Sequence, residues 1–190
     1  MAIKKRPVSP RQKMINLMYV VLMAMLALNV STEVLNGFSI VEESLRRTTA
    51  SSSKENQAIY DDFEAQMKKN PAKVRQWFEK ATMVKDMSDS LYNYAENLKL
   101  LIAREADGKD GDPRNIENKD NLEAASHVML APGTGQGRKL YEAINAYRNK
   151  ILTFITDKTQ KEIIANNLST EVPKRENTLG KNWEEYMFED

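Results

Sequence analysis

The chain has 190 residues, with 28 lysines and arginines against 27 aspartates and glutamates, a net charge of +1, and no cysteine. This balance gives no electrostatic footprint for nucleic acid, and the lack of cysteine excludes disulfides, thiolate metal sites and cysteine nucleophiles. The mean hydropathy of -0.60 is low for a membrane protein, so any bilayer segment must be short relative to the soluble part. The length suits a membrane anchor followed by one domain of moderate size.

The first predicted element is a helix built on an apolar run near the N-terminus. Residues 14–30 form a run of 17 residues in which Asn16 and Asn29 are the clearly polar members. No good small-residue cleavage pattern follows the run, which argues against a cleaved signal peptide. We therefore predict an uncleaved transmembrane helix over residues 11–32.

Charges on the two sides of this run predict its orientation. The run is preceded by cations without any acid, namely Lys4, Lys5, Arg6, Arg11 and Lys13. The first charged residues after it are the glutamates Glu33, Glu42 and Glu43. The positive-inside rule then places an N-terminal tail, residues 1–10, in the cytoplasm and residues 33–190 on the far side of the membrane.

Arg11 is the residue of the predicted span that needs an explanation. Ser9 suits an N-cap and Pro10 the first helical position, so Arg11 falls in the first turn, where the helix dipole disfavours a cation. Two explanations are open. Basic residues beside a span ordinarily extend to lipid phosphates and fix the topology. A guanidinium near the hydrocarbon is also suited to pairing with a carboxylate of a partner protein. Asn16 and Tyr19 extend a polar stripe, or serve interhelical hydrogen bonding and, for Tyr19, the interfacial aromatic belt.

Helical spacing continues directly after the predicted span. Apolar residues recur at Leu35, Phe38, Val41 and Leu45, interrupted by Gly37. Residues 46–57, RRTTASSSKENQ, carry no apolar stripe and form either a frayed connection or a polar helical stalk. The pattern resumes at Ile59, Phe63 and Met67.

Three further helical segments are predicted from capping and periodicity. Asn70 and Pro71 open the clearest helix as N-cap and first-turn residue; Trp77 and Phe78 are expected to pack near its start, and its stripe is Met87, Leu91, Tyr94, Leu98 and Leu101. Loop 107–121 ends this helix, and a short helix follows near residues 122–130.

Another long helix has its stripe at Leu140, Ile144, Tyr147, Ile151 and Phe154, with a continuation or short final turn at Ile163, Ile164 and Leu168. The sequence thus predicts an all-α fold, a single transmembrane helix followed by an up-and-down helical bundle outside the cytoplasm, which the resemblance described below would make periplasmic.

Several residues with possible chemistry are better explained without it. Residues 133–139, GTGQGRK, follow a helix and lack the Gly-Lys-Ser/Thr ending of a phosphate loop, which indicates a linker. Asp107, Asp110 and Asp112 lack the spacing of a calcium loop, and His127 has no second histidine for zinc. We expect no catalytic, cofactor or metal site, and no enzyme.

Two stretches of the sequence carry a resemblance: residues 10–38, PRQKMINLMYVVLMAMLALNVSTEVLNGF, and residues 181–190, KNWEEYMFED. The first is similar to the N-terminal anchor of the GldM/PorM family, a motor subunit of type IX secretion and gliding motility. The second resembles the segment that closes the first periplasmic region of that family. Family members continue with several β-rich domains, so this chain is expected to be truncated at its C-terminus. The resemblance implies a single-pass inner-membrane protein with a cytoplasmic N-terminus.

The resemblance also implies roles and partners. Arg11 matches a family arginine that pairs with a buried glutamate of the multi-span GldL/PorL subunit, and Tyr19 matches a membrane tyrosine; Lys13 and Asn16 match motif positions with a lining role. Two copies of this chain would stand inside a ring of five partner subunits. Proton passage would reset the arginine–glutamate attraction and drive the pair as a shaft, with further secretion components reached through the missing domains.

Two other classes of function remain open from the residues themselves. A single-pass sensor with a ligand-binding periplasmic bundle is the main alternative, although a receptor of that kind needs a returning span that the sequence does not contain. The other is an exported enzyme with a cleaved leader, against which the lack of a convergent nucleophile, base or metal set counts.

Overall fold

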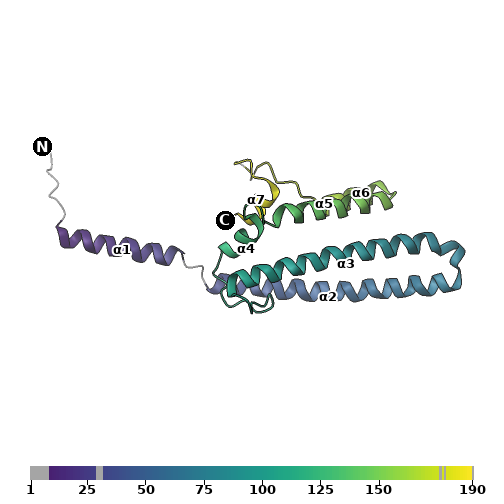
Figure 1. The fold of residues 1–190 in the computed structure, drawn as a ribbon, viewed down its shortest axis with the longest axis horizontal. Coiled ribbons are helices and arrows are strands. Elements are labelled where there is room, and N and C mark those ends of the chain that lie inside the picture. The colour runs from purple at the N-terminus through teal and green to yellow at the C-terminus, as the bar shows by residue number, and fades with distance from the viewer. Residues whose placement is uncertain (1–8, 29–31, 176, 178, 190) are drawn as a thin grey trace. The chain divides into compact units, whose positions relative to one another are not determined.

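The computed structural model describes residues 9–28, 32–175, 177 and 179–189, and its regular elements are helices (Figure 1). Within these residues there are seven: α1 (Pro10–Leu28), α2 (Thr32–Lys69), α3 (Pro71–Asp107), α4 (Glu123–Leu130), α5 (Gly137–Phe154), α6 (Lys158–Asn167) and α7 (Trp183–Phe188). The predicted all-α class is confirmed for the described part. The chain divides into two compact units inside α2, between Thr49 and Ala50.

Helix α1 begins where its capping residues predict. The backbone N–H of Gln12 donates to Ser9 Oγ at 3.3 Å, and the N–H of Lys13 donates to the Ser9 carbonyl at 3.0 Å. Ser9 therefore satisfies N–H groups that the first helical turn leaves open, and Pro10 takes the position where no N–H is needed. Most of the predicted cytoplasmic tail, residues 1–8, lies outside the described residues.

The membrane span expected over residues 11–32 is not found as one helix. Across residues 9–28, 32–175, 177 and 179–189, no helix combines the length and the apolar character that crossing a membrane requires. Helix α1 ends at Leu28, α2 begins at Thr32, and residues 29–31 lie outside the described part. Arg11, Gln12, Lys13 and Asn16 interrupt the first two turns of α1 with polar groups, and the apolar stretch that begins at Leu17 is 12 residues long. A bilayer core takes about 20 helical residues.

Helix α2 is continuous over 38 residues, so residues 46–57 are helical. Of the two possibilities left open by the sequence, the polar helical stalk is correct. Ion pairs one turn apart join Glu42 to Arg46 at 2.9 Å and Glu43 to Arg47 at 3.0 Å. A helix without an apolar stripe relies on such pairs, each contributing about 0.2–0.5 kcal/mol.

Helix α3 follows the predicted start but not all of the predicted packing. It begins at Pro71, yet the Asn70 side chain makes no capping hydrogen bond. Leu98 is buried as predicted, whereas Trp77 and Leu101 are 57% and 44% exposed. Ala103, which is fully buried, lies about 160° around the helix from Leu101, so the face covered near the end of α3 differs from the predicted stripe.

The second unit is layered around α3. Figure 1 shows α3 between the C-terminal part of α2 and α5, and the hydroxyl groups of Ser88 on α3 and Tyr147 on α5 are 2.7 Å apart. Burial raises the pKa of Tyr60 on α2, whose charged neighbours Lys85 and Asp89 are on α3. The short helix α4 packs against α3 and α7, and α5 packs against α3, α6 and α7. The buried hydrophobic residues among those described are few: Leu98, Ala103, Ala124 and Met129.

Candidate functional site

The four residues singled out by the sequence all lie on α1. Arg11, Lys13, Asn16 and Tyr19 are exposed, with Tyr19 at 64%. At about 100° per residue, Asn16 and Tyr19 lie within about 60° of each other, while Arg11 and Lys13 are about 160° apart on either side of them. The structure therefore places Asn16 and Tyr19 on one polar stripe and separates the two cations.

Gln12 belongs to this stripe and was not predicted from the sequence. Its side-chain amide donates to Asn16 Oδ1 at 3.1 Å, and its position falls between Asn16 and Tyr19 around the helix. The signal was present in the sequence, because Gln12 and Asn16 are four residues apart. The Asn16 amide oxygen is thus already partnered within the helix.

The cations of α1 have no anion in their own helix. Residues 10–28 contain no aspartate, glutamate or histidine, and no ion pair within the described ranges includes Arg11 or Lys13. Around them the helix presents apolar side chains that are 38% to 71% exposed: Met14, Ile15, Leu17, Met18, Val20, Val21, Leu22, Met23 and Met25. Helix α1 is therefore an apolar surface with one polar stripe and an unpaired guanidinium.

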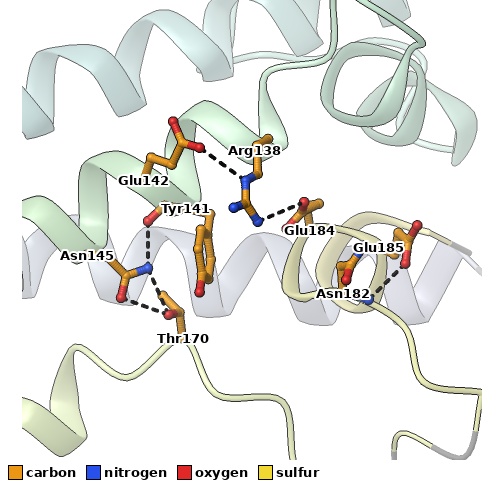
Figure 2. A network of polar contacts seen from close by, with 8 residues as sticks. All are labelled: Arg138, Tyr141, Glu142, Asn145, Thr170, Asn182, Glu184 and Glu185. Carbon is orange, nitrogen blue, oxygen red and sulfur yellow. Dashed lines mark hydrogen bonds and ion pairs between the residues drawn. The ribbon is translucent and has the colours of Figure 1, made fainter.

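A second polar arrangement fastens the C-terminal segment to α5. Figure 2 shows Asn145 on α5 facing Thr170, with its amide nitrogen 3.0 Å from Thr170 Oγ1, and Thr170 donating back to Asn145 Oδ1 at 3.2 Å. The Asn145 amide also donates to the Tyr141 carbonyl at 2.8 Å. Thr170 is buried, so this reciprocal pair satisfies polar groups that water does not reach.

Arg138, near the start of α5, links this helix to α7. Its Nε is 3.1 Å from Glu142 Oε1 and its guanidinium lies 4.8 Å over the Tyr141 ring, while a terminal nitrogen is 3.8 Å from Glu184 Oε1 on α7 (Figure 2). The other carboxylate oxygen of Glu184 is buried and has no hydrogen-bond partner within the described structure. The Trp183 ring lies 5.8 Å from the Tyr141 ring, so polar and aromatic contacts together hold α7 on α5.

Close backbone approach explains the glycine at the start of α5. A Cβ added at Gly137 would lie 2.9 Å from Glu184 Cβ and 3.0 Å from the Met129 carbonyl oxygen. Any side chain at this position would crowd α4 and α7, so glycine is the residue that fits. Residues 133–139, considered above as a phosphate loop, thus belong to a tight helix connection that α7 closes.

The remaining candidates have local structural partners. The Asp107 carboxylate accepts hydrogen bonds from the backbone N–H groups of Glu117 and Asn118, each at 2.8 Å, and these bonds lower the pKa of Asp107. His127 Nδ1 lies 2.6 Å from Glu105 Oε1. In the part of the chain that the structure describes, no three histidine, aspartate or glutamate side chains converge as a metal site.

These features define an all-helical protein in which an apolar helix with a polar stripe precedes a helical domain closed by its own C-terminal segment. The family described as GldM N-terminal domain matches residues 33–190, and the chain belongs to that family. The predicted relationship to GldM/PorM is confirmed, and the chain is a component related to gliding motility and type IX secretion, a machinery that includes other membrane components. No curated protein matches the chain. The family match begins at Glu33, so α1 and its polar stripe lie outside it.

Proposed function

We propose that this chain is the shaft-like subunit of an inner-membrane motor that uses the proton motive force to power type IX protein secretion and gliding. The observation that carries the proposal is the exposed, unpaired Arg11 on an apolar helix. Such a surface needs both an apolar environment and an anion, and membership of the GldM family supplies the setting in which both are expected.

A multi-span partner satisfies both needs at once. Helix α1 is short for a bilayer core, and its first turns are polar, so lipid alone does not suit it. A GldL/PorL-type ring of five subunits around a homodimer of this chain would cover the stripe of Gln12, Asn16 and Tyr19 and bring a carboxylate to Arg11. In this arrangement the N-terminus is cytoplasmic and residues 33–190 lie in the periplasm.

The energy of proton passage is of the right size to act on this contact. One elementary charge crossing 100 mV releases about 2.3 kcal/mol, comparable with the roughly 2.5–3.5 kcal/mol cost of placing a charged residue at a helix centre. Residues 10–28 contain no acid or histidine, so the proton acceptor belongs to the partner. Protonation of that carboxylate releases the guanidinium, and deprotonation restores the pair.

Transmission out of the membrane is assigned to α2. It begins at Thr32, four residues beyond the end of α1, and continues without a break to Lys69. Its polar middle is held by the Glu42–Arg46 and Glu43–Arg47 pairs. A continuous helix transmits displacement better than the frayed connection that the sequence left possible.

The test is the Arg11→Ala substitution in the full complex. Removing one member of a buried ion pair costs about 3–5 kcal/mol, so the multi-span partner should bind at least about a hundredfold more weakly, and secretion and gliding should stop. Arg11→Lys should recover only part of the binding, because an ammonium cannot replace a bidentate guanidinium. Copurification from mild detergent and a gliding assay measure these two outcomes.

Arg6→Ala is the matched control. It removes the same side chain and charge from the proposed cytoplasmic tail, before α1 begins, and we expect near-normal assembly and motility. If Arg11→Ala assembles and glides like the unmodified protein, the motor assignment is wrong. Equal loss in both variants would instead point to general charge at the membrane boundary.

A further inference from the structure

The turn between α2 and α3 concentrates positive charge. Only Asn70 separates the two helices, and residues 68–80, here called the cationic tip, contain one acid, Glu79, and five cations: Lys68, Lys69, Lys73, Arg75 and Lys80. Apart from the tip and residues 1–13, the chain has 18 lysines and arginines against 26 aspartates and glutamates. The tip is therefore a positive end on an otherwise acidic protein.

Most of the tip cations are available to an external anion. Lys68 pairs with Glu64 one turn back, at 2.8 Å. Lys69, Lys73 and Arg75 are exposed, and none of them takes part in an ion pair among the described residues. These three cations are spread over the last turn of α2 and the first turns of α3.

Trp77 stands among these cations with more than half of its surface exposed. It shares one face of α3 with Lys73 and Lys80, at spacings of four and three residues, and is 57% exposed. The Lys80 ammonium lies 4.9 Å from the centroid of the Trp77 ring. More than half of the residue stays exposed beside this cation, which leaves an amphipathic ring in the middle of the cationic tip.

We propose that the cationic tip docks on the surface of a bilayer containing anionic phospholipid. Tryptophan sits preferentially at the level of lipid headgroups, and lysine chains extend along it to reach the phosphates. Exposed cations near such a surface are attracted within about one Debye length, and the acidic remainder of the chain is repelled, so the tip is the end that turns toward the lipid. This site uses no residue of α1 and goes beyond the proposed motor function.

The test uses the full chain, with the apolar surface of α1 covered by a non-ionic amphipol. Vesicles of phosphatidylcholine with or without phosphatidylglycerol are added, the bound fraction is measured by sedimentation, and brominated phosphatidylcholine in the vesicles serves as a quencher of tryptophan emission. We expect binding to the anionic vesicles only, weakened by salt, with quenching that disappears in Trp77→Phe. Trp183, packed beside Tyr141, remains as the unquenched reference.

A pair of charge-reversal variants provides the matched comparison. Lys73→Glu with Arg75→Glu should lower partitioning by about tenfold or more, because each cation contributes roughly fivefold near an anionic surface. Lys158→Glu with Lys161→Glu makes the same charge change at exposed positions of α6 and should leave partitioning within about twofold. Lys73→Gln with Arg75→Gln repeats the test without adding negative charge.

Several results would overturn the proposal. One is the absence of vesicle binding, and another is an equal loss of binding in the Lys158→Glu, Lys161→Glu control. A third is loss of binding in millimolar inorganic phosphate, which would mean that the tip recognises single phosphate ions rather than a lipid surface. Retention on isolated cell-wall glycan without binding to vesicles would also overturn it. None of these outcomes bears on Arg11, so the motor assignment is tested separately.

Discussion

At the scale of single residues, Asp107 shows how one carboxylate orders a loop. Its two oxygens accept hydrogen bonds from the N–H groups of Asn118 and Glu117, and the Asn118 side chain donates to the Ala106 carbonyl at 3.0 Å. The contacts join residues ten to twelve positions apart. The loop 107–121 is therefore tied to the end of α3.

These bonds predict a pH dependence of stability. They lower the pKa of Asp107 in the folded protein, so their contribution is fully present above the unfolded pKa of about 3.9 and is lost as the pH falls through the folded pKa. Asp107→Asn should lower the urea midpoint at neutral pH and reduce the loss of stability on acidification below about pH 4. Urea titrations at several pH values measure both effects.

Asp110→Asn is the control for this prediction. Asp110 lies in the same loop, is exposed, and accepts none of the loop's hydrogen bonds found within the described residues. The Asp110→Asn substitution should leave the urea midpoint and the pH dependence of that midpoint unchanged. Identical behaviour of the two variants would show that the Asp107 bonds do not stabilise the fold.

At the scale of helices, capping and periodicity predicted most element boundaries. Ser9 with Pro10 and Pro71 marked the starts of α1 and α3, and the short helix near residues 122–130 is α4, because these signals depend on a few neighbouring residues. Helix α7 was not predicted as a helix. Its six residues are too few to show a period, and its capping box of Asn182 and Glu185 was the available signal.

Two glycines in helices are predicted to respond oppositely to alanine. A Cβ added at Gly37 in α2 would have no other atom within 4 Å, so Gly37→Ala should stabilise α2 by about 0.5–1 kcal/mol. Gly137→Ala places its methyl group against Glu184 and should cost about 1–3 kcal/mol by displacing α7. Hydrogen exchange in α2 and denaturant unfolding measure the two changes.

Measuring both the stability and the gliding of Gly37→Ala distinguishes a structural role of Gly37 from a role in movement. If Gly37→Ala stabilises α2 but impairs gliding, then flexibility at this position is needed for the proposed motor function. If Gly137→Ala leaves the unfolding midpoint unchanged, the close approach of α7 to α5 does not contribute to stability.

At the scale of the whole chain, the part of the structure that the sequence could not predict is held together by contacts between residues far apart in the sequence. Asn145 with Thr170 and Arg138 with Glu184 join residues whose types and spacing carry no pairing signal. The stripe of α1 was predictable because its members lie within two turns of one helix. The anion that we propose for Arg11 was not, because no residue of α1 supplies one.

The two tryptophans give a test of how the domain is closed. Trp183 packs between Tyr141 and Phe188, with ring centroids 5.8 and 6.0 Å away, so Trp183→Ala should lower the free energy of unfolding by about 2–3 kcal/mol and expose α5 to hydrogen exchange. Trp77→Ala, at an exposed site, should change it by less than about 0.5 kcal/mol. Similar losses in the two variants would contradict the closing role of α7.

The Ser88–Tyr147 hydroxyl contact joins residues 59 positions apart, whereas the stabilising pairs of α2 span four residues. Closing a loop of this length costs conformational entropy, so contacts between distant residues form slowly, whereas contacts between neighbouring residues form early. The long helices α2 and α3 are therefore expected to acquire structure first as the chain emerges from the ribosome, and the register between α3 and α5 is fixed in a later step.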